Sequence, residues 1–306
     1  FFAILGTLPL AIPSYVLALS YTSMFSWFSG FFASWITLSL ATAPYVFLGV
    51  SAALVRVDTS QEEVARSLGL SRFMVFIKVT WPQIKTAATA SGLLVALYTL
   101  SEFGAVSILR YDTFTRAIYN AYRGSFDRTA AASLAVVLVL LTLIALYFER
   151  RVRNRYLSVE SSGRRILVEL GNWKVLAMTM FGTLGLFGAG FPIAALTGWA
   201  FVGSSRSTWG ELLSALGSSL SLALLAGVVI GIFATAVALW NVRYGSRFSS
   251  VIETTVWSSH ALPALVVGLA LVFVGANLTP WIYQTVWLLV FAYLILFLPN
   301  ALSVIA

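Results

Sequence analysis

Long apolar runs separated by short polar stretches form the dominant pattern of the chain. Most runs are close to 20 residues long and are continuous rather than alternating. A continuous run of about 20 apolar residues crosses the roughly 30 Å hydrocarbon layer of a bilayer as a helix, whereas barrel strands alternate apolar and polar positions. We therefore predict an all-α, polytopic membrane protein with about eight transmembrane helices, at residues 2–22, 33–55, 86–109, 129–148, 173–196, 216–240, 252–274 and 285–306.

The composition agrees with this pattern and excludes several kinds of site. Hydrophobic residues make up 59% of the 306 positions and charged residues 10%, against about 25% charged in soluble domains. Cysteine is absent, which excludes disulfides and thiolate metal sites. The one histidine, His260, is interpreted as a polar residue near a helix end rather than as a metal ligand. No cofactor and no metal are expected.

The basic residues predict how the chain is oriented. Fourteen Lys and Arg lie in residues 56–85, 149–174 and 241–247, and five lie in the alternate connections. The positive-inside rule places the first set in the cytoplasm, with both chain ends near that face. Because the arginines lie in these connections and not on one soluble face, the net charge of +8 does not indicate nucleic-acid binding. The first run lacks a signal-peptide pattern, and without an initiating Met the chain is expected to be truncated there.

A basic stretch divides the chain into two similar parts. Residues 151–172 form a predicted cytoplasmic linker between a first unit, 1–150, and a second unit, 173–306. Pro13 and Pro263 each stand at the start of a span, and Pro44 and Pro299 each lie in the next span, at an offset of about 250 residues. Prolines at corresponding places in two halves indicate a transporter built from repeats, with the broken helices near its pathway.

Glu102 is the carboxylate that lies within a predicted span, in the sequence SEFGA. An ionisable residue in the membrane is expensive and is a default candidate for function. We therefore count Glu102 and the four prolines as candidate residues of a translocation pathway or gate. The alternative is a carboxylate that joins helices near the outer face.

Residues 60–85 interrupt the apolar pattern with a polar, amphipathic segment. Two overlapping capping boxes, Thr59 with Glu62 and Ser60 with Glu63, predict a helix that begins near residue 61. Glycine at 69 is expected to end this helix, and proline at 82 to break or kink the chain before the next span. Small residues at 65 and 69 would allow a partner protein to approach this helix closely. The alternative interpretation of the segment is an amphipathic helix that lies on the membrane surface.

The segment resembles the EAA loop of the permeases of ATP-binding cassette (ABC) importers. The pattern E-x-A-x3-G-x9-aliphatic-x-apolar-P is met, and the chain departs from the family consensus at Val64, Val79 and Trp81. The resemblance implies that residues 57–85 form a coupling loop that docks on an ATPase. The residues expected to couple the two proteins are Glu63, Ala65, Gly69, Val79 and Pro82.

The stretches LPLAIPSYVLALSY and SEFGAVSILRYDTFTRAIYNAY, with the two-part layout, resemble the ferric-iron branch of these permeases. That resemblance implies the type I importer permease fold in two tandem units of six spans each. On that template the sequence lacks the first two spans of unit one. It also lacks the last two spans of unit two and a second coupling loop beyond Ala306.

The function implied is that of a permease subunit in the bacterial cytoplasmic membrane. It moves ferric iron by alternating access, with a cytoplasmic ATPase dimer, a periplasmic or lipoprotein binding protein, and membrane lipids as partners. The motif G-x-x-x-x-G-K-[ST] is absent from the sequence, so ATP hydrolysis is expected on a separate subunit. Thiamine, phosphonate and polyamine are alternative substrates. An ion-coupled secondary transporter and a structural membrane scaffold are alternative functions.

Overall fold

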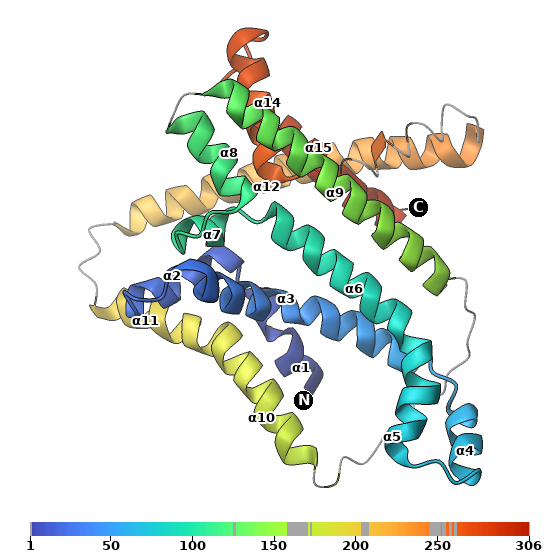
Figure 1. The fold of residues 1–306 in the computed structure, drawn as a ribbon. Helices are drawn as coiled ribbons and strands as arrows, with labels where there is room; N and C mark the ends of the chain where they lie inside the picture. The colour runs from blue at the N-terminus through green and yellow to red at the C-terminus, as the bar shows by residue number, and fades with distance from the viewer. Residues whose placement is uncertain are drawn as a thin grey trace. The chain divides into compact units, whose positions relative to one another are not determined.

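The computed structural model describes residues 2–124, 127–157, 171, 173–202, 208–244, 252, 255–256, 259 and 262–305. All regular elements within these residues are helical, as the continuous apolar runs predict (Figure 1). The elements, with η1 a 3-10 turn and η2 and η3 wider π-helical turns, are α1 (Phe2–Thr7), η1 (Leu8–Ala11), α2 (Ser14–Met24), α3 (Gly30–Val55), α4 (Thr59–Ser67), α5 (Arg72–Val75), η2 (Phe76–Thr80), α6 (Trp81–Ser101), α7 (Gly104–Ile108), α8 (Phe114–Arg123), α9 (Arg128–Leu157), α10 (Trp173–Gly185), η3 (Leu186–Gly190), α11 (Phe191–Val202), α12 (Trp209–Tyr244), α14 (Ala264–Asn277) and α15 (Val286–Ile305).

The membrane-spanning character of the helices is confirmed, but the spans differ from the expected set. Within the described residues, the helical runs long and apolar enough to cross a bilayer are Gly30–Val55, Arg72–Ser101, Arg128–Val152, Trp173–Val202 and Trp209–Arg243. The first predicted span is a broken helix, in which α1–η1 and α2 meet at 84°, and α14 and α15 are shorter apolar helices. The count of about eight is reached only when the broken span and the two short helices are included.

The chain separates into two compact units in space. Unit 1 contains residues 1–117 and 144–203, and unit 2 contains residues 118–143 and 204–306. These units group residues that are close in space, which is a different criterion from repeats along the sequence. The division into 1–150, 151–172 and 173–306 therefore stays a prediction.

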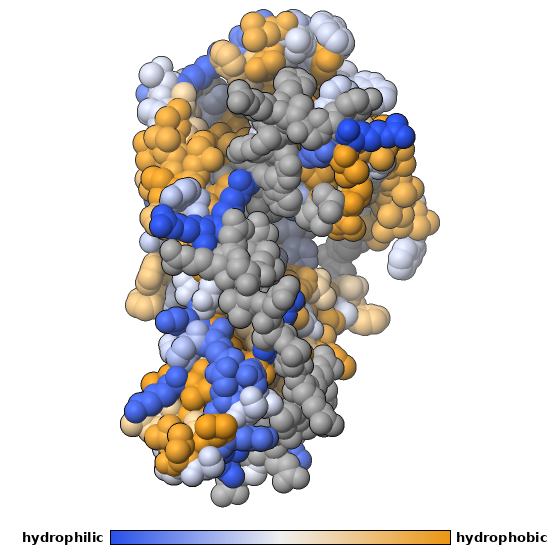
Figure 2. All heavy atoms as spheres, turned by 90° about the vertical axis from the view of Figure 1, so that its right-hand side faces the viewer, coloured by the Kyte–Doolittle hydropathy of each residue, from blue (hydrophilic) through white to orange (hydrophobic). Residues whose placement is uncertain are grey.

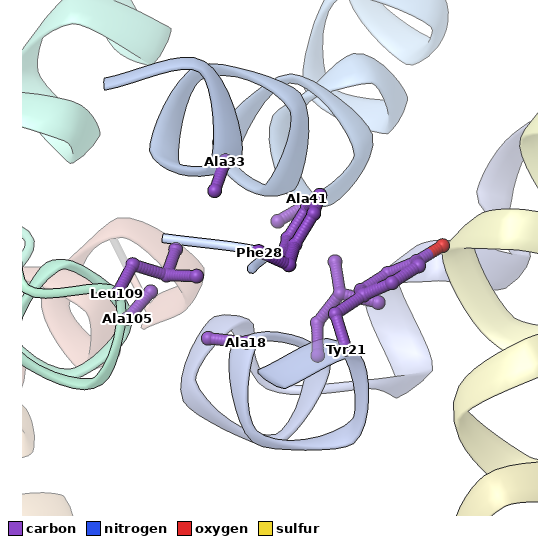
Figure 3. Close-up of a cluster of buried hydrophobic side chains, with 8 residues drawn as sticks. Ala18, Tyr21, Phe28, Ala33, Ala41, Ala105 and Leu109 are labelled. Atoms are coloured by element: carbon purple, nitrogen blue, oxygen red, sulfur yellow. The ribbon is translucent and has the colours of Figure 1, made fainter. Parts of the chain in front are cut away.

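The core of unit 1 lies between α2, α3 and α7. Small residues bring these helices close together, and larger side chains fill the remaining space (Figure 3). The buried cluster consists of Leu17, Ala18, Tyr21, Phe28, Ala33, Ala41, Ala105 and Leu109. Outside this core, large apolar side chains such as Phe32 and Trp35 are exposed, as expected for helix faces that contact lipid rather than water.

The broken first span packs against the π turn η3. Proline at 192 has no N–H to donate, so a π turn ahead of it leaves the Phe187 carbonyl without its helical partner. The hydroxyl of Tyr21 donates to this carbonyl at 2.8 Å, and Figure 3 shows the Tyr21 oxygen directed toward the neighbouring yellow helix. A Cβ added to Gly188 would stand 2.5 Å from Cγ of Pro9. Glycine at 188 therefore permits the close approach of η1 and η3.

In unit 2, α15 packs along α12 and also contacts α14. The hydroxyl of Ser259 donates to the carbonyl of Ile295 at 2.9 Å and fixes the chain ahead of α14 to α15. Pro263 is the N-cap residue of α14, and Pro299 lies inside α15.

Candidate functional site

The polar segment begins with a helix that Asp58 caps. Oδ1 of Asp58 accepts hydrogen bonds from the Ser60 hydroxyl at 2.6 Å and the Ser60 N–H at 3.0 Å, and Oδ2 accepts one from the Gln61 amide at 3.1 Å. The bonds from the Ser60 hydroxyl and N–H lower the pKa of Asp58. The predicted capping boxes at Thr59 and Ser60 are therefore wrong. Helix α4 starts at Thr59, because the residue before it supplies a better acceptor.

Helix α4 ends at Gly69, as the sequence predicts. Gly69 has φ +85°, a left-handed conformation that glycine adopts without strain. The N–H of Leu70 donates to the carbonyl of Ala65 at 3.2 Å, and the N–H of Gly69 donates to the carbonyl of Arg66 at 2.9 Å. These two bonds form a complete Schellman motif. The reversal of the chain after α4 thus depends on glycine at this position.

Of the break or kink predicted at Pro82, the break is wrong. The residues from Arg72 to Ser101 form one continuous helical run, and Pro82 stands in the first turn of α6. The turn before it, η2, is widened, so that the N–H of Trp81 bonds to the carbonyl of Phe76, five residues back. Widening the turn accommodates a proline whose ring would collide with the carbonyl of a regular α-helix.

Hydrogen bonds and buried side chains hold α4 against this long helix. The hydroxyl of Thr80 donates to Oε1 of Glu62, and the N–H of Asp58 donates to Oε1 of Gln83 at 3.1 Å. Val75 is buried. Ala65 is also buried, with 7% of its surface exposed, so its side chain does not face outward, and its part in coupling stays a prediction. The small side chain instead allows α4 to lie close to the rest of the segment.

We call residues 58–83 the α4–α5 module. It lies beyond the ends of α3 and α6 in Figure 1, and its outer surface exposes apolar side chains beside charged ones. Val64, Leu68 and Phe73 are 58%, 77% and 71% exposed, and Glu63 and Arg66 are exposed on the same short helix. Figure 2 shows polar and apolar atoms side by side at this end. The module therefore has its own internal contacts and an exposed amphipathic outer surface.

Of the remaining predicted coupling residues, Val79 lies in η2 and is half-buried, whereas Glu63 is exposed on α4. The sequence analysis missed Asp58 and Thr80 as structural partners. A local signal was available for the first, because an aspartate directly before Thr and Ser is a favourable N-cap. No local signal was available for Thr80, which meets Glu62 across the turn.

A second polar site lies where two helices are interrupted. Pro13 is the N-cap residue of α2 and follows the 84° bend. Oε2 of Glu102 accepts from the hydroxyl of Ser14 at 3.0 Å, and Oε1 accepts from the N–H of Ala105 at 2.9 Å. The hydroxyl of Thr115 donates to the Glu102 carbonyl at 2.6 Å. Glu102 therefore joins α2, the end of α6, α7 and α8, and each of its two carboxylate oxygens accepts one hydrogen bond.

The candidate prolines fall into two matched pairs. Pro13 and Pro263 are N-cap residues of α2 and α14, with φ and ψ of −57° and 142° and of −62° and 132°. Pro44 and Pro299 lie inside α3 and α15. The repeat itself stays a prediction. Within unit 1, Glu102 lies beside Pro13, because it accepts a hydrogen bond from the adjacent Ser14. His260 lies outside the described residues.

The described part of the chain holds no cluster of the side chains that commonly bind metal ions. No group of three or more His, Cys, Asp or Glu side chains gathers among those residues. The arrangement can instead support two tasks: protein docking at the α4–α5 module, and mechanical connection of a broken span through Glu102.

Comparison with known proteins identifies relatives among bacterial permeases. The chain is 35% identical to the Fe(3+)-transport system permease protein FbpB 2 of Haemophilus influenzae, over 98% of this chain and 61% of that protein. It is 24% identical to the ferric transport system permease protein FbpB of Actinobacillus pleuropneumoniae, over 87% and 45% of the two chains. It is 27% identical to the sulfate transport system permease protein CysT of Escherichia coli, over 52% and 63%.

The chain thus spans less than two thirds of the length of these relatives. No solved structure matches it significantly. Residues 1–157 match the family model described as binding-protein-dependent transport system inner membrane component. This match and the apolar helices confirm a multi-pass protein of the inner membrane and the resemblance to importer permeases. The chain belongs to the family of binding-protein-dependent transport system inner membrane components.

Proposed function

We propose that the chain is part of the permease of an ATP-driven importer for ferric iron. In this proposal a binding protein delivers the substrate on the outer side, and a separate ATPase drives alternating access from the cytoplasm. The observation that carries the proposal is the α4–α5 module, an internally bonded segment with an exposed amphipathic surface at the predicted cytoplasmic side.

The exposed residues of the module favour a protein partner. Leu68 and Phe73 are more than two thirds exposed, and clustered apolar residues rimmed by charges are typical of interaction sites. Burying an apolar side chain of this kind contributes about 1.5–3 kcal/mol. Glu63 and Arg66 then supply charge complementarity at the rim, while Ala65 acts from inside by keeping α4 close to its support.

The continuous helix behind the module supports a mechanical role. The run from Arg72 to Ser101 has 30 residues and is about 45 Å long at 1.5 Å per residue. One end adjoins the exposed Phe73, and the other adjoins Glu102, which is bonded to Ser14 at the break of the first span. In the proposed mechanism, ATPase closure moves the module, and this helix transmits the displacement to the broken span.

Ferric iron is the proposed substrate because the relatives with the greatest shared length carry ferric transport in their names. Sulfate appears in the name of a relative that matches a shorter part of the chain. Both carboxylate oxygens of Glu102 accept hydrogen bonds within the protein, from the Ser14 hydroxyl and the Ala105 N–H, which favours a joining role for this residue in the proposed permease.

Two experiments test the proposal. Full-length transporter, reconstituted with its ATPase and binding protein, should take up radiolabelled ferric iron in an ATP-dependent manner and should not take up sulfate or thiamine. Uptake of one of the latter alone would refute the iron assignment. For the docking surface, Leu68→Asp should weaken ATPase assembly, and Leu68→Met, which keeps the surface apolar, should not. Equal assembly of both variants would refute docking at this surface.

A further inference from the structure

Unit 2 contains a cavity of about 560 Å³ between the end of α8, the first turns of α9, and α14. Its walls consist mostly of apolar side chains, and its polar groups come from three residues near the α8–α9 connection. The lining residues are Ile118, Tyr122, Arg128, Thr129, Ala131, Ala132, Ala135, Val266, Leu269, Ala270, Phe273 and Val274.

The polar and apolar residues occupy different parts of this cavity. Tyr122, Arg128 and Thr129 stand where α8 ends and α9 enters its membrane-spanning run, which begins at Arg128. The alanines of α9 follow over the next two turns, and the α14 residues 266–274 recur at helical spacing along one face. At 1.5 Å per residue the apolar part extends about 10–12 Å from the polar end. The cavity is therefore amphipathic, with its polar end at the edge of the membrane.

The charge at this end is positive. Within the described residues Arg128 forms no ion pair. The neighbouring carboxylate of Asp127 accepts from the N–H of Ala130 at 2.9 Å and so caps α9. A guanidinium with five donors, beside a phenol and a hydroxyl, matches a phosphate group.

We propose that this cavity binds one anionic phospholipid of the membrane. The phosphate lies at Arg128, with Tyr122 and Thr129 as further hydrogen-bond donors, and an acyl chain lies along the α9 alanines and the apolar face of α14. Arg128 gives the site its preference for an anionic headgroup, because any lipid can cover the apolar walls but only an anionic one complements the guanidinium.

Native mass spectrometry of the full-length transporter, with phosphatidylglycerol or phosphatidylcholine added, tests this site. The wild-type protein should retain one phosphatidylglycerol in preference to phosphatidylcholine. Arg128→Gln should lower this retention about five- to tenfold, the effect of one basic group near a membrane surface. The matched control is Arg123→Gln, an exposed arginine on α8 that does not line the cavity, and it should retain phosphatidylglycerol like the wild type.

A second variant tests the apolar part without altering charge. Ala132→Phe, at an exposed lining position, should fill the cavity and lower retention while leaving the thermal midpoint near that of the wild type. Equal retention by wild type and Arg128→Gln would overturn the proposal. So would equal losses from both arginine variants, or equal retention of the two lipids. A photo-reactive residue at position 132 that captures another transmembrane segment instead of lipid would also overturn it.

Discussion

Gly69 offers the sharpest test of the α4–α5 module, because the strain of a substitution can be separated from its bulk. The residue has φ +85°, and a Cβ built there would meet nothing within 4 Å. Most L-residues therefore pay a backbone cost of about 1–2 kcal/mol, but their Cβ does not collide with the chain itself. The cost corresponds to roughly a 5- to 30-fold shift toward an opened end of α4.

Three substitutions share this position and differ in what they add. Gly69→Asn introduces little strain because asparagine tolerates the left-handed region, Gly69→Ala adds strain without bulk, and Gly69→Glu adds strain, bulk and charge. If a partner docks closely at this position, Asn and Ala should preserve most ATP-driven uptake, whereas Glu should uncouple ATP hydrolysis from uptake. Paired measurements of ATPase activity and uptake in proteoliposomes provide the readout.

The outcomes distinguish the explanations. Loss of coupling in Gly69→Ala equal to that in Gly69→Glu would refute the docking argument and assign the effect to the Schellman turn. Normal uptake by Gly69→Glu would remove Gly69 from the docking surface altogether. Amide hydrogen exchange in α4 gives an independent measure of the strain, since it reports opening whether or not the ATPase is bound.

Three further predictions follow from hydrogen bonds and close contacts. Asp58→Ala should raise amide exchange at the start of α4 several-fold. Because the pKa of Asp58 is lowered in the folded protein, the stability that its carboxylate gives to α4 is complete above pH 3.8 and is lost as the pH falls through the folded pKa. Glu102→Ala should destabilise the transporter by about 1.5–3 kcal/mol for each charged hydrogen bond lost, measured as a lower thermal midpoint. Gly188→Ala should lower the free energy of unfolding by about 1–3 kcal/mol, because the added carbon would lie 2.5 Å from a proline ring.

Each of these predictions has a matched control. Asp58→Asn keeps an acceptor at the N-cap, so it should largely preserve α4 and abolish the acid dependence. Glu102→Gln keeps one acceptor oxygen, and retention of transport with loss of little stability would favour a joining role over a charge-based one. Gly182→Ala lies on α10, where an added Cβ meets nothing within 4 Å. Equal effects of Gly182→Ala and Gly188→Ala would contradict the close contact.

Properties set by neighbouring residues were predictable from the sequence. The apolar runs specify helices because a backbone in lipid must bond within its own segment, and Gly69 specifies a helix end because few other residues accept its conformation. The contacts of Glu102 were not predictable in this way. Its partner Ser14 lies 88 residues away, and only the packing of α2 against α7 brings the two together.

The predicted capping boxes failed because more than one nearby residue can cap a helix. A capping box at Thr59 or Ser60 was chemically reasonable, but Asp58 accepts from Ser60 and displaces both. The small residues at 65 and 69 did not indicate which of them faces outward, and the structure buries Ala65 and exposes Gly69.

The π turn before Pro82 has the largest consequence for the proposed mechanism. A break at this proline would have placed a flexible joint between the docking surface and the membrane. The wider turn keeps the helix continuous from Arg72 to Ser101, because it absorbs the missing N–H and the ring without ending the helix. A π turn also precedes Pro192, where the Tyr21 hydroxyl donates to the Phe187 carbonyl that has no partner within the helix. Continuity of this kind transmits a displacement along the helix axis, whereas a joint would dissipate it before it reached Glu102.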